Sequence, residues 1–488
     1  MNVNWTVVSI IFNVILFLIP IVMLFIVPIN RKPSSAIAWL LLIAMFPVIG
    51  LLIFLLFGSS KLPQHRRAQQ RMMDEVVAAK VSEDRRNPEL APLVCPPVSL
   101  HYEPFARLNV TLGGMPVFGG NQVELLPDYL GALQRIVEDI DGAQRYVHLE
   151  YFALSYDDET EPVFAAMECA AKRGVKVRVL MDHYGSLVYP NYRAMRKRLT
   201  AVGIEHRLML PINFFDWDFS RFDLRNHRKI VVVDDGIGYT GSQNMIRRNY
   251  FRRDDLYYNE LVARVTGPVV HQLGAVFLTD WCVEASAIPT PNQFPELGIE
   301  WRRKGDMLAQ VLPSGPGHDN ENNLKLFTAL VHAAQHKLVL VTPYFVPDES
   351  LMLAITTAAQ RGVNVTLVNS EAADQFLAYR AQQSYYEELL RAGVKIYLYR
   401  RPALLHSKSM SIDDDIAVIG SSNLDMRSFQ LDLEVTLVCP DRQVVADLRR
   451  VEDDYLRQSK QIDLHTWLER PLIARLSNSL ARLTSALQ

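Results

Sequence analysis

The feature that most constrains this chain of 488 residues is a motif that occurs twice. Residues 227–244 read HRKIVVVDDGIGYTGSQN, and residues 406–423 read HSKSMSIDDDIAVIGSSN. Both copies have the spacing H-x-K-x4-D-x6-G-S-x-N, and each motif position in the second copy lies 179 residues (406 − 227) after its counterpart. Because this period is far longer than that of a solenoid repeat, it indicates a duplicated domain.

The segments around the motif also occur twice. AKRGVKVRVLMD at 171–182 resembles AQRGVNVTLVNS at 359–370, and each reads as a helix that ends at glycine before a β-rich strand. Further β-rich runs at 145–154 and 337–346 are each followed by an acidic turn and a helical pattern. Alternating strands and helices predict an α/β fold in which each half has a mixed sheet covered on both faces. We therefore expect two tandem α/β units related by a pseudo-twofold axis.

Two apolar runs precede these units. Residues 7–27 are interrupted only by Ser9 and Asn13, and residues 36–57 carry no charge. At about 1.5 Å per residue, each run is about 30 Å long as a helix, which is enough to cross a bilayer. A cleaved signal peptide is disfavoured because the preceding MNVNWT has no lysine or arginine. A transmembrane hairpin is therefore expected.

The flanking charges predict its orientation. Arg31 and Lys32 lie between the runs, whereas a larger positive cluster follows the second run, at Lys61, Arg66, Arg67 and Arg71. By the positive-inside rule the C-terminal side is cytoplasmic. We expect a multi-pass protein of the inner cell membrane with its catalytic domain on the cytoplasmic side.

These patterns give an expected domain organisation. The segment after the hairpin is polar and contains prolines, as is typical of a linker. Near the C-terminus, leucines recur every three or four residues from Leu468 to Leu487, which predicts an amphipathic helix. Such a helix could lie on the membrane surface or pack on the catalytic domain. The expected parts are a hairpin over 1–60, a linker over 61–110, a first unit over 111–293 and a second unit over 294–488.

Composition excludes several function classes. The formal net charge is only −2, which does not fit a protein that coats nucleic acid. The four cysteines form no C-x-x-C pair, which argues against a disulfide framework or a zinc site. The chain has no G-x-x-x-x-G-K-[ST] loop for nucleotide phosphates.

The motif residues predict phosphodiester chemistry. Residues two apart on a strand share a face, so each histidine lies beside the lysine of its own copy. If the two halves face each other, they form a cationic pocket with too few carboxylates for a metal, suited to the oxygens of one phosphodiester. We expect neither a metal nor a cofactor. The candidate catalytic residues are His227, Lys229, Asp234, His406, Lys408 and Asp413.

The two histidines can divide the reaction between them. One imidazole attacks phosphorus and forms a phosphohistidine, while the other protonates the leaving alkoxide, because histidine titrates near neutral pH. The residues leave open which histidine is the nucleophile, with a slight preference for His227. Glu260 and Glu434 are candidates to orient the imidazoles, although ordinary salt bridges are an alternative for both. The other candidates for phosphate binding or support are Ser242, Asn244, Ser421 and Asn423.

These motifs carry a resemblance to a known family. The doubled motif resembles that of the phospholipase D superfamily, and nearly the whole chain is similar to bacterial cardiolipin synthases of that type. The stretches that carry this likeness include EYFALSYDD, LMDHYGS, RNHRKIVVVDD, TPYFVPDES and SSNLDMRSF. The resemblance implies two α/β halves with the site between them, a phosphohistidine intermediate and no metal requirement. It also implies condensation of two phosphatidylglycerol molecules into cardiolipin with release of glycerol.

Other interpretations stay open at this point. A hydrolytic phospholipase D would use the same site with water as the acceptor. A nuclease of the superfamily is disfavoured by the apolar hairpin, and a non-catalytic scaffold by the intact motifs. The expected partners are phosphatidylglycerol and membrane lipid rather than nucleic acid, and the oligomeric state is open. The aromatic segment 213–222 either contacts acyl chains or packs in the core.

Overall fold

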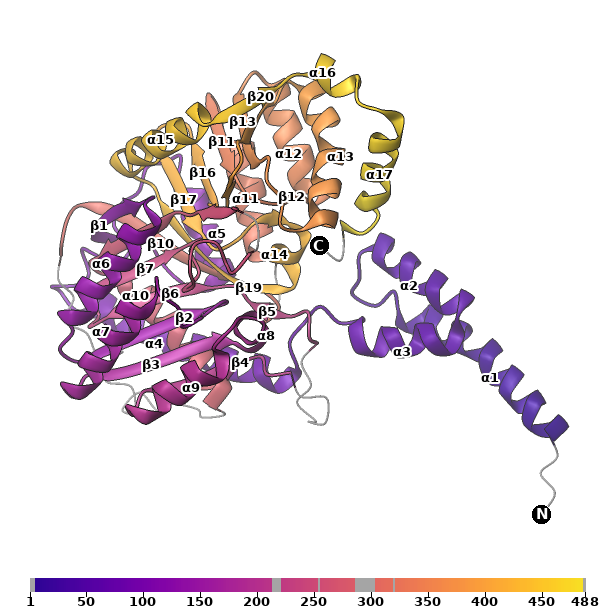
Figure 1. Cartoon of the computed structure of the whole chain (residues 1–488), viewed down its shortest axis with the longest axis horizontal. Coiled ribbons are helices and arrows are strands. Elements are labelled where there is room, and N and C mark those ends of the chain that lie inside the picture. Colours follow the sequence, from indigo (N-terminus) through magenta and orange to yellow (C-terminus); the bar gives the residue numbers. More distant parts are fainter. Residues whose placement is uncertain (1–4, 213–220, 253–254, 286–302, 319–320, 486–488) are drawn as a thin grey trace. The chain divides into compact units, whose positions relative to one another are not determined.

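The computed structural model describes residues 5–212, 221–252, 255–285, 303–318 and 321–485 (Figure 1). The chain divides into two compact units, Met1–Leu62 and Pro63–Gln488. The aromatic segment lies outside the described residues except for Arg221 and Phe222, and so does the boundary expected at 293/294.

The first unit contains three apolar helices, α1 (Trp5–Ile26), α2 (Pro33–Met45) and α3 (Pro47–Phe57). Within the described residues, α1 is the one helix that is long and apolar enough to cross a membrane. The second expected span is divided at Phe46, whose φ of −136° and ψ of 76° are not helical. The cause is Pro47, which has no amide hydrogen and disfavours the helical conformation of the residue before it.

The second unit is built on one mixed sheet of sixteen strands, counted over the described residues. Its two halves meet where β1 pairs antiparallel with β10, and the strands then run outward from this seam in the same relative order on both sides. The order in the first half is β1 (Phe118–Leu126), β9 (Val262–Thr266), β7 (Ile237–Gly241), β6 (Lys229–Val233), β2 (Tyr146–Tyr151), β3 (Lys176–Asp182) and β4 (Glu205–Met209).

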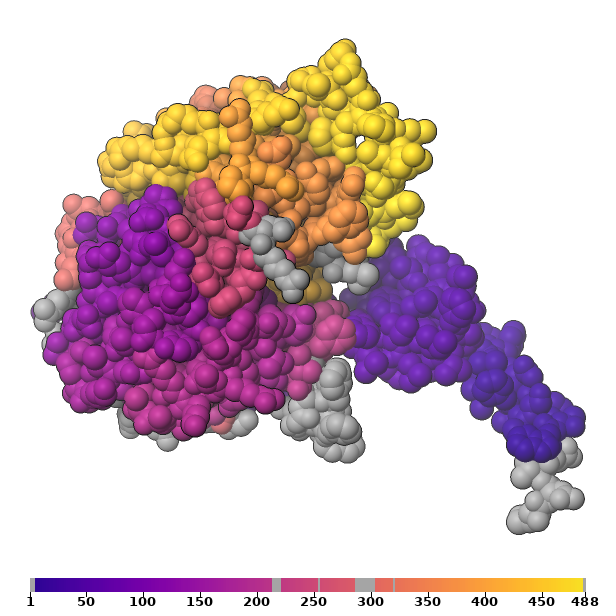
Figure 2. Space-filling view, in the orientation of Figure 1, coloured from indigo at the N-terminus to yellow at the C-terminus, as the bar shows by residue number. Residues whose placement is uncertain are grey.

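The second half repeats this arrangement and adds a strand at its edge. Its order is β10 (Met307–Ser314), β19 (Asp432–Cys439), β17 (Ile416–Gly420), β16 (Ser409–Ile412), β11 (Lys337–Val341), β13 (Asn364–Ser370), β14 (Lys395–Tyr399) and β20 (Ser459–Ile462). In the space-filling view the two halves form adjoining lobes of this unit, magenta for the first and orange to yellow for the second (Figure 2).

Helices cover both faces of the sheet because strand side chains alternate. In β6, Val231 and Val233 join the core under the outer helices of the first half, whereas Ile230 and Val232 join the core on the other face. The helices of the first half are α6 (Tyr129–Asp141), α7 (Glu161–Lys172), α8 (His183–Leu187), α9 (Tyr192–Ala201) and α10 (Val270–Ala285). Those of the second are α11 (Asn322–Ala333), α12 (Glu349–Gln360), α13 (Phe376–Ala392), α14 (Met426–Gln430), α15 (Arg442–Arg457), α16 (Leu464–Leu468) and α17 (Leu472–Arg482). The expected α/β fold with two similar halves is confirmed.

Much of the segment expected as a linker is folded onto the second unit. Helix α4 (Gln64–Arg86) packs on α10, where Arg66 and Glu284 form a buried ion pair of 2.5 Å. Helix α5 (Glu103–Gly113) packs on α11 and β10, with Phe105 and Leu112 in the core. The polar sequence had concealed these apolar positions.

The C-terminal amphipathic helix packs with the face opposite to its leucines. Helix α17 lies on α13 and buries Asn478 and Ala481, whereas Leu472 and Leu480 are 67% and 66% exposed. The helix therefore contacts the domain and also presents an apolar stripe to its surroundings.

Candidate active site

Each motif histidine is held against a strand of the opposite half. His227 follows β5 (Arg225–Asn226), which pairs parallel with the start of β19, and its backbone N–H donates to the carbonyl of Leu433 at 2.8 Å. His406 follows β15 (Ala403–Leu405), which pairs parallel with β8 (Tyr257–Asn259), and its N–H donates to the carbonyl of Asn259 at 2.7 Å. Two short equivalent ladders thus bring both histidines to one pocket.

The imidazoles receive their carboxylate partners from the opposite halves. His227 Nδ1 lies 3.0 Å from Glu434 Oε1, and His406 Nδ1 lies 2.8 and 2.9 Å from the two carboxylate oxygens of Glu260. Both glutamates are buried. Since Nδ1 is occupied in each ring, Nε2 is the nitrogen left for chemistry in the pocket.

Burial and charge set the protonation of these pairs. Burial, only partly opposed by the charge of Glu434, lowers the pKa of His227 to about 4. Burial also lowers the pKa of His406, while Glu260 acts in the opposite direction. For Glu434 burial raises the pKa, but His227 and Lys229 outweigh it and the net pKa is lowered. The carboxylates therefore stay ionised beside the imidazoles.

The motif lysines bond to the backbone of their own histidines and are not among the described residues that line the pocket. Lys229 Nζ donates to the carbonyl of His227 at 2.5 Å, and Lys408 Nζ donates to that of His406 at 2.5 Å. Burial lowers the pKa of Lys229 to about 7 and that of Lys408 to about 8. An anionic ligand would stabilise both ammonium groups and raise these pKa values again.

The serines and asparagines divide into two roles. Ser421 Oγ donates to Glu434, and Ser242 Oγ accepts the N–H of Leu261 at 2.9 Å, so both hydroxyls support the glutamate strands. Asn244 and Asn423 line the pocket itself. Asn244 is also bonded within the wall, because its Oδ1 accepts the N–H of Ala153 at 3.2 Å and its Nδ2 donates to the Tyr250 hydroxyl at 3.0 Å.

The structure does not bring Asp234 and Asp413 to this pocket, and we correct the expectation that they are catalytic. Asp234 accepts the backbone N–H groups of residues 144, 145 and 146 at 2.5, 2.8 and 2.8 Å. Asp413 accepts those of residues 335, 336 and 337 at 3.0, 2.7 and 2.9 Å. Each aspartate lies five positions after its lysine along the chain, a length of about 16 Å at 3.3 Å per residue. Both carboxylates fix the start of the neighbouring strand, β2 or β11.

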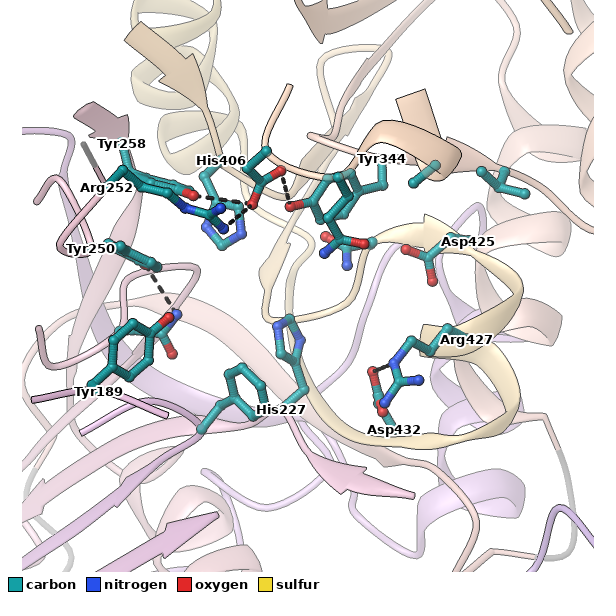
Figure 3. A pocket seen from close by; sticks show the side chains of 17 residues that line it. Tyr189, His227, Tyr250, Arg252, Tyr258, Tyr344, His406, Asp425, Arg427 and Asp432 are labelled. Atoms are coloured by element: carbon teal, nitrogen blue, oxygen red, sulfur yellow. Dashed lines mark hydrogen bonds and ion pairs between the residues drawn. The ribbon is translucent and has the colours of Figure 1, made fainter. Parts of the chain in front are cut away.

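Sequence reasoning missed much of the pocket lining (Figure 3). Tyr258 and Asp432 hold the same register position in β8 and β19, beside His406 and His227 respectively. Each lies two residues before one of the orienting glutamates, so strand periodicity was a signal that could have found them. The cavity measures about 170 Å³, and its other missed lining residues include Phe152, Tyr189, Tyr250, Arg252, Tyr344, Asp374, Asp425 and Arg427.

The two sides of the pocket differ in chemistry. The rings of Tyr250, Tyr258 and Tyr344 surround His406 with centroid distances of 6.2, 5.4 and 6.3 Å. The Tyr258 and Tyr344 hydroxyls donate to Asp374 at 3.0 and 2.7 Å. On the side of His227, Arg427 pairs with Asp432 at 3.1 Å. Among the described residues, no group of three or more histidine, cysteine and acidic side chains is placed to hold a metal ion.

Comparison with known proteins gives consistent matches. The family described as "Cardiolipin synthase, PLD-like domain" matches residues 136–281 and 327–454, and "Phospholipase_D-nuclease N-terminal" matches residues 5–59. Cardiolipin synthase A of Proteus mirabilis (strain HI4320) is 33% identical over 465 residues, which are 94% of each chain. Cardiolipin synthase A of Yersinia pseudotuberculosis serotype O:1b (strain IP 31758) is 35% identical over 458 residues, 92% of each chain.

A solved structure shares the fold. The crystal structure of phosphatidylserine synthase from Haemophilus influenzae Rd KW20 superposes with a TM-score of 0.61 at 18% sequence identity. The match covers 80% of this chain and 100% of that chain. Both motif copies fall inside the two family-matched segments.

Proposed function

The chain belongs to the cardiolipin synthase family with phospholipase D-like domains, and from this premise we propose that it condenses two phosphatidylglycerol molecules into cardiolipin and glycerol. The observation that carries the proposal is that each histidine pairs with a glutamate of the opposite half in one pocket, His227 with Glu434 and His406 with Glu260. The reaction exchanges one phosphodiester for another, so it needs no nucleotide.

In the first step a neutral histidine attacks the donor lipid. We assign this role to His227, whose pKa is lowered to about 4, and the acid role to His406, whose Nδ1 contacts both Glu260 oxygens. A bond forms between Nε2 and phosphorus while the bond from phosphorus to the oxygen of the headgroup glycerol breaks. The diacylglycerol oxygen stays on phosphorus. His406 gives its proton to the leaving alkoxide, and Glu260 stabilises the imidazolium that supplies it.

In the second step the acceptor lipid takes the place of glycerol. His406 Nε2, now neutral, removes the proton from a hydroxyl of the second phosphatidylglycerol. The resulting oxygen attacks phosphorus, the P–N bond breaks, and neutral His227 is restored. During both steps Lys229, Lys408, Asn244 and Asn423 are the groups that we assign to the non-bridging oxygens.

The test supplies the purified full-length protein with phosphatidylglycerol alone and identifies the products by mass spectrometry. Cardiolipin and glycerol in equal amounts support the proposal, whereas phosphatidic acid would assign a hydrolytic phospholipase D. His227→Ala and His406→Ala should each abolish turnover. A phosphorylated peptide trapped during turnover should contain residue 227, and one containing residue 406 would reverse the two assigned roles. Undiminished turnover in chelator would support the absence of a metal requirement.

For the membrane we propose more than one pass. Helix α1 is one span, and the broken pair α2 and α3 forms the second apolar element. The positive cluster that begins at Lys61 supports an orientation with the catalytic unit on the cytoplasmic side of the inner membrane. Labelling of single cysteines by a membrane-impermeant reagent tests this orientation, since labelling of the catalytic unit from outside intact cells would contradict it.

A further inference from the structure

The proposed reaction requires the pocket to bind a second phosphate, which a hydrolase does not need to bind. The acceptor is itself an anionic lipid, so the product holds two phosphodiesters joined through one glycerol. When the reacting phosphate lies between the two histidines, the second phosphate lies about one glycerol length away. An anion at that distance in a partly buried site needs a cationic partner.

Among the described residues that line the pocket, two carry a permanent positive charge, Arg252 and Arg427. Arg427 is already bonded to other residues of the pocket wall. Its Nε donates to Asp432 at 3.1 Å and its Nη2 donates to the carbonyl of Asp223 at 2.7 Å. These bonds hold α14 against the segment before β5, so Arg427 serves the frame on the side of His227.

Arg252 is held more loosely, on the side of His406 (Figure 3). Its Nη2 lies 3.4 Å from Asp374 Oδ2, longer than the usual 2.7–2.9 Å of a charge-assisted hydrogen bond. Asp374 also accepts the Tyr258 and Tyr344 hydroxyls, so its charge is shared among three donors. The Arg252 side chain is 44% exposed, so an incoming anion can reach the guanidinium without displacing the core.

Arg252 also lies on the side of the pocket where the acceptor is expected. In an in-line displacement the leaving and entering oxygens lie opposite the nucleophile. With His227 as the nucleophile, both oxygens lie beside His406, where Arg252 is. The placement of the acceptor beside Arg252 rests on the proposed function and on that assignment of the two histidines. We infer that Arg252 binds the non-reacting phosphate of the acceptor phosphatidylglycerol, which selects an anionic lipid over water or a simple alcohol.

The experiment compares two acceptors at the same catalytic centre. One assay measures cardiolipin from phosphatidylglycerol vesicles, and the other measures incorporation of labelled glycerol into phosphatidylglycerol, which requires no second phosphate. Arg252→Gln should lower cardiolipin formation about 10- to 100-fold, as expected for loss of a charge-assisted bond, and leave glycerol exchange within about twofold of the parent. Arg252→Lys, which keeps the charge, should recover part of the loss.

Arg248→Gln is the matched control. Arg248 lies four residues earlier, is 51% exposed and pairs with Glu159 at 3.5 Å outside the pocket lining. It should change neither assay. Equal loss of both activities in Arg252→Gln, or no loss of either, would overturn the inference. Selective loss of cardiolipin formation in Arg427→Gln alone would also overturn it, by moving the acceptor to the side of His227. If the parent protein shows neither activity, the proposed function fails instead.

Discussion

Replacement of Glu260 by glutamine is the most direct test of the imidazole–carboxylate pairs that form between the two halves. Glu260 is 1% exposed and places both oxygens within 2.9 Å of His406 Nδ1. Glutamine keeps the shape but removes the charge that stabilises the imidazolium. A buried hydrogen bond to a charged group contributes about 1.5–3 kcal/mol, so kcat should fall roughly 10- to 160-fold. KM should also rise, because the charge of Glu260 raises the pKa of Lys408 and its removal leaves that phosphate-binding group less protonated.

The same variant should change the pH dependence. In the parent protein burial lowers the pKa of His406 and Glu260 raises it. Without the carboxylate the pKa of His406 falls further, so the protonated acid is lost at a lower pH than before. The high-pH limb of the kcat profile should therefore move to lower pH. Initial rates of cardiolipin formation at saturating phosphatidylglycerol, measured across pH 5–9, provide both readouts.

A buried glutamate elsewhere controls for general destabilisation. Glu452 in α15 is also 1% exposed and accepts from Ser411 Oγ at 2.6 and 2.8 Å, away from the pocket. Glu452→Gln should keep the parent kcat and pH profile even if its melting temperature changes. An unchanged kcat in Glu260→Gln, or an effect of the same size in both variants, would refute the role that we give to Glu260.

Three further predictions concern groups outside that pair. Asp234→Ala removes three backbone hydrogen bonds and should lower the melting temperature while kcat of the folded fraction stays within about threefold; a loss of kcat at unchanged stability would restore a catalytic role. His148 is buried between Tyr146 and Phe277, and burial lowers its pKa well below the usual value. The folded state therefore resists protonation of His148, and the stability of the protein falls as the pH drops below about 6.5. His148→Phe should reduce the loss of melting temperature between pH 6.5 and 5. Equal losses in parent and variant would contradict this. Finally, Lys229 has a pKa of about 7, so KM for phosphatidylglycerol should rise above that pH as its charge is lost, and a KM that is flat to pH 9 would exclude this contribution.

The sequence was most informative where a pattern is local. Strand periodicity placed each lysine beside its histidine, because residues two apart share a face. The same rule also argued against Asp234, which is an odd seven positions from His227 and lies at the far end of the strand. Its membership in the repeated motif hid a structural role in binding backbone amides.

Pairings between the halves could not be read from the chain. Glu260 and Glu434 occupy equivalent positions, so either could have served either histidine. The choice is made by β5 with β19 and β15 with β8, ladders of two or three residues that leave no periodic signal. The break at Phe46 was accessible in principle from Pro47, but a long apolar run masked it.

The crossed supply of carboxylates has a consequence for synthesis of the protein on the ribosome. When the first half has emerged, it contains His227 but not Glu434, and its own Glu260 has no histidine to orient. The nascent chain is already close to its lipid substrate through α1, yet the pocket stays chemically incomplete until β19 has been translated and folded against β5. A truncated product would therefore be inert toward the membrane that holds it. The catalytic site therefore becomes active only after the second half of the chain has been translated and folded.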